Sequence, residues 1–446
     1  MATGRTHDAV TVPVDGSTAP ADETPAPARL ADRWIRRALL VMPALAALGS
    51  FVSASPGSSG TANGYRVVTA VALIPALLML SRTPSRGLAT KLLLATTVAF
   101  AVWGAIGLSW TPAPDVGQRQ LLGILLAIAG AWVAIGLTSS RPETVQHLRA
   151  GFVLAAFVLT SIGLWQYATG NNLWSLAGQT IRFDASLLIG SFVNPNNFAA
   201  FLLGCAGPVL SWALAAKGIR KPFAVTLLAA MAFVILGTTS RAGVLGLVVI
   251  VVSVLIIVMM QAPKTQVPVL FTLVTIALAT WAAFSQQITA GLSTAFAGGT
   301  GGSDDLRVSL SQTAVHYFVD SDGLGIGPAG FQERLALETS QSVLATHNTF
   351  LQMAAEYGFP VALPAFALVA VIATSALRSP NRSHTLVDPA RIEMVAGIIA
   401  IGIGALVASS LIADPSWWLL IGYMVVLARQ SRGQDDAASK SRAPAN

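Results

Sequence analysis

The sequence predicts an all-α integral membrane protein with about twelve transmembrane helices. Hydrophobic residues make up 54% of the 446 residues and charged residues only 11%, whereas a soluble domain carries about 25% charged residues. A soluble fold cannot bury so much apolar surface and still present a polar exterior. The apolar runs approach the ~20 residues of a spanning helix and lack the alternation of a β-barrel strand. The composition therefore excludes a soluble enzyme and a disordered chain.

Each predicted span is an apolar run that is free or nearly free of charge. The second and the last runs are the shortest and weakest. In chain order the runs are centred on Ala38–Val52, Val67–Leu80, Leu92–Ser109, Leu121–Leu137, Gly151–Trp165, Phe198–Ala215, Pro222–Gly237, Ala242–Met260, Val267–Phe284, Pro360–Leu377, Met394–Ile412 and Trp417–Leu427.

The two ends of the chain differ from its apolar middle. Residues 1–32 are rich in Ala, Thr, Pro and Asp, so they are expected to form a disordered cytoplasmic tail. Residues 33–429 form the predicted transmembrane domain, and residues 430–446 a second cytoplasmic tail. Because Arg33, Arg36 and Arg37 precede the first run, this run is expected to be a retained anchor and not a cleaved signal.

The distribution of basic residues orients the chain. If the N-terminus is cytoplasmic, all but six of the 27 Lys and Arg residues fall on the cytoplasmic side. This bias follows the positive-inside rule and places both termini in the cytoplasm. The formal net charge of +7 then reports orientation, and no nucleic-acid partner is expected. The six outer residues are Arg66, Arg119, Arg182, Arg241, Arg307 and Arg334.

Two outer segments are long, and the longer one separates the ninth and tenth spans at about residues 286–346. Loops of this length usually carry function or their own small structure. Asp304 and Asp305 in this loop could hold a divalent metal. Adjacent carboxylates in a loop are more often solvated or paired with a neighbouring Arg, and no metal site is assigned. The single cysteine, Cys205, excludes a disulfide framework.

Three spans are predicted to begin at the outer surface with polar residues. Thr238, Thr239 and Ser240 precede Arg241 and can cap the eighth span, whose positive helix end then forms an anion site with the Arg. The alternative is an interfacial Arg that reaches lipid phosphate. Asn194, Asn196 and Asn197 flank Pro195 at the start of the sixth span, where they either cap a helix or position a substrate.

The third outer start carries the candidate base. Thr346 or Asn348 can cap a helix beside His347, and Gly358 can end or kink that helix. Histidine has a reference pKa near ~6.5 and can accept a proton at neutral pH, although a lone interfacial His is more often structural. Upstream, the glycines of Gly323–Phe331, including Gly325 and Gly327, allow tight turns or close approach of the backbone to a ligand.

Taken together, these segments resemble the bacterial O-antigen ligase and polymerase superfamily. The resemblance covers about residues 190–358, whereas the first five spans match in hydropathy alone. The matching pieces, in family order, are Gly190–Asn197, Thr239–Gly243, the Arg307 region, Gly325–Gly327 and His347–Asn348.

The resemblance implies a metal-independent, inverting membrane glycosyltransferase without a cofactor. Such a protein transfers a glycan from a polyprenyl diphosphate carrier to an acceptor hydroxyl on a glycan, lipid or protein, at the outer face of the cytoplasmic membrane. His347, Arg241 and Arg307 are the expected catalytic residues. The resemblance also implies substrate contacts for Arg182, Asn194, Asn197, Gly325, Gly327 and Asn348.

A transporter or lipid flippase for an anionic substrate is the alternative. Transporters place ionisable residues and broken helices at mid-membrane, whereas these apolar runs carry almost no charge and their polar clusters lie at the outer ends. The sequence leaves open whether the protein is a ligase, a polymerase or a protein oligosaccharyltransferase.

Overall fold

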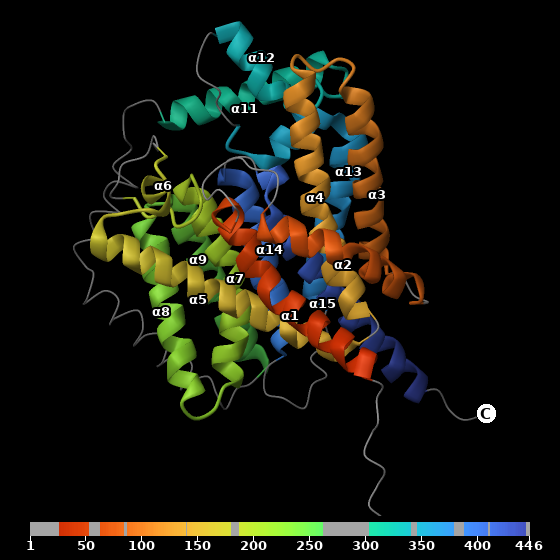
Figure 1. The fold of residues 1–446 in the computed structure, drawn as a ribbon, viewed down its shortest axis with the longest axis vertical. Coiled ribbons are helices and arrows are strands. Elements are labelled where there is room, and N and C mark those ends of the chain that lie inside the picture. Colours follow the sequence, from red (N-terminus) through yellow and green to blue (C-terminus); the bar gives the residue numbers. More distant parts are fainter. Residues whose placement is uncertain are drawn as a thin grey trace, which may run out of the picture.

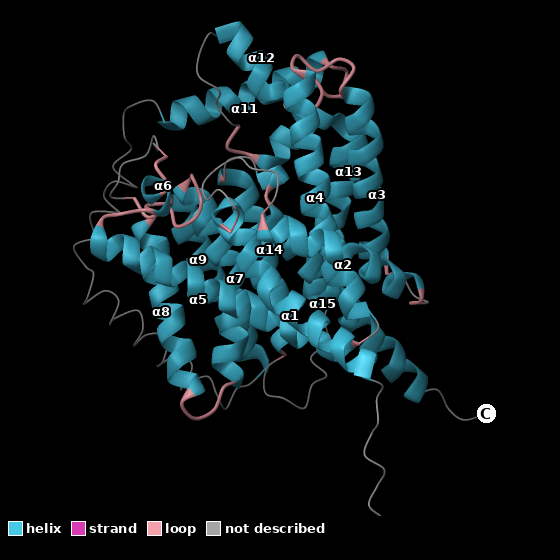
Figure 2. Cartoon of the chain, in the orientation of Figure 1, coloured by secondary structure: helices cyan, strands magenta, loops and turns pink. Residues whose placement is uncertain are grey.

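The computed structural model describes residues 26–52, 63–83, 87–139, 141–179, 187–261, 303–339, 346–378, 388–408 and 411–442. Within these ranges the regular elements are helices and no strand occurs (Figure 2). The long helices are α1 (Ala26–Leu48), α2 (Gly64–Ser81), α3 (Leu88–Gly107), α4 (Pro114–Ser139), α5 (Val145–Thr169), α7 (Pro195–Ala215), α8 (Arg220–Gly237), α9 (Arg241–Gln261), α13 (Thr349–Arg378), α14 (Pro389–Val407) and α15 (Pro415–Arg442). Three others lie between them, namely α6 (Leu173–Leu176), α11 (Ser303–Asp320) and α12 (Gly330–Thr339).

The all-α membrane class is confirmed. Among the described residues, nine helices are long and apolar enough to cross a membrane: α2, α3, α4, α5, α7, α8, α9, α13 and α14. The expected span at Val267–Phe284 lies outside the described residues. Helices α1 and α15 do not reach that apolar standard, because each carries its apolar run together with a charged end. The total of twelve spans therefore stays a prediction.

Three helices have bounds that differ from the expected spans. Helix α1 begins at Ala26, within the expected N-terminal tail, and α15 continues to Arg442, through most of the expected C-terminal tail. The extension of α1 is rich in Ala and Arg, which favour helix regardless of hydropathy. Helix α13 begins at Thr349, well before its apolar run, at the helix start that the capping residues Thr346 and Asn348 predict.

Figure 1 shows two opposite ends of the molecule. Helices α11 and α12 lie at one end, beside the connection between α3 and α4. The connection between α7 and α8, the start of α1 and the end of α15 lie at the other. This arrangement agrees with the alternation of spans expected from the sequence. Which end faces the cytoplasm remains a prediction.

Small residues bring the helices close together. A Cβ atom on Gly207 of α7 would lie 3.0 Å from Glu393 Cα on α14, and one on Gly422 of α15 would lie 2.7 Å from Ala131 Cα on α4. Such close contacts are typical of membrane helices, which associate through packing because the surrounding lipid is itself apolar.

A buried ionic cluster, defined by Arg149, Ser211, Glu393 and Tyr423, joins α5, α7, α14 and α15. The Glu393 side chain is fully buried, and Arg149 Nε lies 2.6 Å from its Oε1 atom. The hydroxyl groups of Ser211 and Tyr423 donate hydrogen bonds to the same carboxylate. The sequence analysis placed Arg149 and Glu393 in polar inner segments, because both stand at the edge of an apolar run.

Candidate functional site

The first part of the candidate site is the start of α7. The Asn194 side chain accepts a hydrogen bond from the Asn196 backbone N–H at 2.8 Å, and Pro195 occupies the first turn. Asn194 therefore caps α7, as the sequence analysis allowed. Asn197 follows within the first turn and is half-buried.

Gln166 of α5 holds the segment that leads into α7. Its side-chain oxygen accepts hydrogen bonds from the N–H groups of Ile189 and Gly190, both at 3.1 Å, and its amide group donates to Leu187 O at 2.8 Å. Gln166 is buried, so these bonds satisfy a polar side chain that would otherwise be costly inside the protein. The sequence did not point to Gln166, because it ends an apolar run with no motif around it.

The second part is the start of α9. Ser240 is buried, and its hydroxyl accepts a hydrogen bond from the Gly243 N–H at 3.1 Å, so it caps the helix as expected. Thr239 has φ 55°, a left-handed conformation that is a genuine outlier for a β-branched residue. Such strain clusters at functional sites. Arg241 follows at the first position of the helix and is exposed.

Helices α7 and α9 begin side by side. A Cβ atom on Gly243 of α9 would lie 2.7 Å from Ala199 Cβ on α7, which leaves room only for glycine. The segment before α7 is also hydrogen-bonded to the end of α8, because the Leu188 N–H donates to Gly237 O at 3.3 Å. The capped starts of α7 and α9 therefore lie next to each other.

The third part is the start of α13, with His347 immediately before it. The Asn348 side-chain oxygen accepts the Leu351 N–H at 3.0 Å, and the Thr346 hydroxyl donates to Asn348 O at 2.9 Å. His347 lies between these two residues with φ 53°. Both expected capping residues thus form the helix start, and they place a half-buried imidazole in a strained backbone position.

The electrostatics of His347 connect it with α11. Burial lowers the pKa of His347 below its usual 6.5, and the positive charge of Arg307 lowers this pKa further. The imidazole is therefore neutral at neutral pH, which a proton acceptor requires. The structure thus brings together two of the three expected catalytic residues from segments separated by α12.

Helix α13 is interrupted at Gly358, about two to three turns after His347. Gly358 departs from helical geometry, with φ 64° and ψ −167°. Pro360 has no N–H, so the Glu356 carbonyl cannot receive its usual bond from four residues ahead. The Gly327 N–H donates to this carbonyl instead at 2.9 Å, and the Ile326 N–H donates to Ala355 O at 2.9 Å. The glycine-rich loop before α12, residues 323–329, therefore supplies hydrogen bonds that α13 cannot make within itself.

The glycine-rich loop, residues 323–329, is also held by α3 and the turn that follows it. Trp103 Nε1 donates to Leu324 O at 2.9 Å, and Trp110 Nε1 donates to Gly325 O at 3.0 Å. A Cβ atom on Gly325, which has φ +85°, would lie 2.6 Å from Glu356 O. The close packing around residue 325 therefore explains why a glycine is needed there. The substrate contacts expected for Gly325 and Gly327 stay predictions.

A buried polar network lies behind the loop. The Glu356 carboxylate accepts a hydrogen bond from Gln120 Nε2 at 3.0 Å and another from Gln352 Nε2 at 3.3 Å. The Gln120 amide oxygen accepts bonds from the Ala329 N–H and from the Tyr357 hydroxyl. The structure buries Glu356, a carboxylate that the sequence analysis did not single out.

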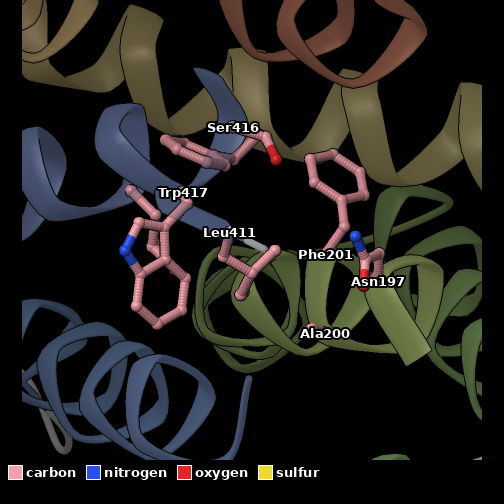
Figure 3. A pocket seen from close by; sticks show the side chains of 9 residues that line it. Asn197, Ala200, Phe201, Leu411, Ser416 and Trp417 are labelled. Atoms are coloured by element: carbon pink, nitrogen blue, oxygen red, sulfur yellow. The ribbon is translucent and has the colours of Figure 1, made fainter. Parts of the chain in front are cut away.

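Two small hollows meet at Trp417, near the start of α15. One encloses about 310 Å³, counting the solvent in front of it, and is lined by Phe152, Phe201, Asn197, Ser416 and Trp417 among others. Figure 3 shows α7 and the start of α15 on its two sides. The second hollow is lined by Thr349 and Phe350 of α13 together with Trp417. Trp417 thus connects the surroundings of Asn197 with the start of α13.

Other expected residues lie outside this geometry. Arg182 lies outside the described residues, and the side chains of Asp304 and Asp305 are likewise not described. In the described part of the chain, no group of three His, Cys, Asp or Glu side chains could hold a metal ion.

The fold defines a polytopic membrane protein, and the starts of α9 and α13 together with α11 carry its candidate Arg and His residues. Residues 226–366, roughly a third of the chain, match the family described as O-antigen ligase. This segment includes Arg241, Arg307, His347 and the break at Gly358, and it confirms the resemblance to the O-antigen ligase and polymerase superfamily. A search of curated proteins found no match to the chain.

Proposed function

We propose that this protein is a glycosyltransferase of cell-surface polysaccharide assembly that uses a glycan linked to polyprenyl diphosphate. The observation that carries the proposal is the neutral His347 beside Arg307, within the segment that matches the O-antigen ligase family. A neutral base next to a fixed cation suits a reaction in which a hydroxyl loses a proton while a diphosphate leaves.

The proposed reaction is a single displacement. His347 removes the proton from the acceptor hydroxyl, and the hydroxyl oxygen attacks the anomeric carbon of the donor sugar. The bond from this carbon to the diphosphate oxygen breaks, the polyprenyl diphosphate leaves with the electron pair, and the configuration inverts. Arg307 and Arg241, with the capped start of α9, hold the diphosphate and stabilise its growing charge. No metal ion is needed in this scheme.

The proposed orientation places α11, α12 and the starts of α7, α9 and α13 at the outer face of the cytoplasmic membrane. Both termini are then cytoplasmic, in agreement with the distribution of basic residues. The donor is drawn from the outer leaflet. The acceptor class, whether glycan, lipid or protein, is left open.

Reconstituted protein, supplied with a polyprenyl diphosphate glycan and candidate acceptors, tests the proposal directly. Formation of a glycosidic product, at a rate that is strongly reduced but measurable in His347→Ala and Arg307→Gln, is the expected result. Wild-type activity in His347→Ala would remove the base from the scheme.

Two structural features favour a transporter as the second candidate. Helix α13 is broken at Gly358, and Glu356 is buried immediately before the break. Broken helices and intramembrane carboxylates are frequent in transporters. Movement of a labelled polyprenyl diphosphate glycan across vesicle membranes, with no covalent product, would favour this candidate over the transferase.

A further inference from the structure

Glu356 is a buried carboxylate to which the proposed reaction gives no role. Its side chain is 1% exposed. Each of its two oxygens accepts one amide hydrogen bond, Oε2 from Gln120 on α4 and Oε1 from Gln352 on α13. A buried carboxylate is costly unless such partners satisfy it, so the site is built around this side chain.

Gln120 extends the contact to a third segment of the chain. Its amide oxygen accepts the N–H of Ala329, the residue before α12, and the Tyr357 hydroxyl at 3.3 Å. Ala329 has φ 58°, a conformation that few non-glycine residues adopt. The Gln120–Glu356 pair therefore fastens α4, α13 and the strained end of the glycine-rich loop at one point, which we term the joint.

The joint lies between the elements that carry Arg307 and His347. Arg307 lies on α11, and the glycine-rich loop connects α11 to α12. His347 lies just before α13, which contains Glu356. The apolar core shared by these elements is small and consists of Leu310, Ala314, Tyr317, Ile326, Phe331, Leu335 and Ala355. Apart from this core and the ring contact between Phe318 of α11 and Phe359 of α13, polar contacts contribute to the position of α11 relative to α13.

We infer that Glu356, through Gln120, is a positioning residue that keeps Arg307 in place beside His347. This inference rests on the proposed function for its catalytic meaning. The structural claim, that the joint fixes α11 against α13, stands independently. Glu356 touches no reacting atom in this scheme and acts through Gln120 and the backbone of Ala329 and Phe331.

The chain offers a matched pair of substitutions. In Glu356→Gln the new side chain has the same shape. Once the Gln352 amide turns over, the new NH₂ group can donate to Gln352 Oε1, which has no hydrogen-bond partner in the described structure. The bond from Gln120 to the remaining oxygen is kept. In Glu356→Leu all acceptors are lost and the amide group of Gln120 stays buried without its partner, which is unfavourable.

Two measurements test the joint without any substrate. Spin labels at Gln312 on α11 and Leu363 on α13, both exposed, report the distance between these helices, and the buried Cys205 does not compete for the label. Histidine NMR, with the His347 signal assigned from its loss in His347→Gln, reports the pKa of His347. Glu356→Leu should broaden or shift the distance distribution and raise this pKa toward 6.5, because Arg307 moves away. Glu356→Gln should match the wild type in both.

Activity then tests the catalytic meaning. Glu356→Leu should lower kcat by about 100-fold, the loss that a misplacement of ~1 Å can cause, with little change in KM, whereas Glu356→Gln should stay within about threefold of the wild type. An unchanged distance and pKa in Glu356→Leu would overturn the joint. If Glu356→Leu does not fold, Gln120→Leu breaks the same joint from α4 and takes its place. A wild type without transferase activity would contradict the proposed function alone.

Discussion

Removing the charge of Glu393 should destabilise the protein by about 3–5 kcal/mol, the usual cost of breaking a buried ion pair from one side. Glu393 is fully buried, Arg149 is 28% exposed and their charged atoms are 2.6 Å apart. In Glu393→Gln, the Arg149 guanidinium keeps its partly buried place without a counterion. The hydroxyl groups of Ser211 and Tyr423 also exchange a charged acceptor for a neutral one, and hydrogen bonds to charged groups are the stronger kind.

The free energy of unfolding of each variant can be measured by titration with a denaturing detergent. An exposed ion pair in the same protein supplies a control. Arg141 pairs with Asp32 near the end of α4, but its side chain is 45% exposed. Arg141→Gln should therefore cost less than about 1 kcal/mol, as exposed ion pairs do. The double variant Arg149→Met, Glu393→Leu should recover much of the single-variant loss, because no buried charge is left without a partner. If Glu393→Gln costs no more than Arg141→Gln, the reasoning from burial is refuted.

Four further predictions concern the candidate site. The rate of the proposed transfer should be full at neutral pH and should fall as the pH drops through the pKa of His347, which lies below 6.5. In Arg307→Gln this fall should occur at a higher pH, because the positive charge that lowers the pKa of His347 is removed. Profiles of kcat/KM against pH measure the effect, and an unchanged profile would contradict the interaction between Arg307 and His347. His347→Ala should lower kcat by about 10²–10⁴-fold. Arg241→Gln should raise the KM for the diphosphate donor. Product formation in vesicles measures both effects. Gly325→Ala should lower stability by about 1–3 kcal/mol in detergent unfolding, because φ +85° and the nearby Glu356 carbonyl both oppose a side chain; a neutral effect would show that the loop can yield.

The local features of the site were predictable from the sequence. Asn194, Ser240 and Asn348 cap their helices as proposed, because a cap depends on a side chain and an N–H only two or three residues away. The kink at Gly358 was predictable for the same reason. Each of these signals lies within one turn of helix.

The long-range contacts were not predictable from the sequence. Gln166, Gln120 and Glu356 each bind backbone or side chains from distant segments, and nothing adjacent to them in the chain marks that role. Glu393 and Arg149 were assigned to polar ends because hydropathy averages over a window and does not reveal which charged residue faces a partner. A useful signal was present at Pro360, which follows Glu356 by one helical turn and removes the N–H that the Glu356 carbonyl needs.

The exchange of hydrogen bonds between α13 and the glycine-rich loop has a consequence for the engineering of this protein. The loop and α13 satisfy each other's backbone N–H and carbonyl groups at the break in the helix, so each leaves polar backbone groups without partners when the other is absent. A chimera that takes α11, the glycine-rich loop and α12 from a relative and keeps the native α13 would join two surfaces that do not complement one another. The smallest portable unit therefore extends from α11 through the second half of α13 and includes the part of the chain from Trp103 to Gln120. Acceptor specificity should be transplanted between relatives in units of that size.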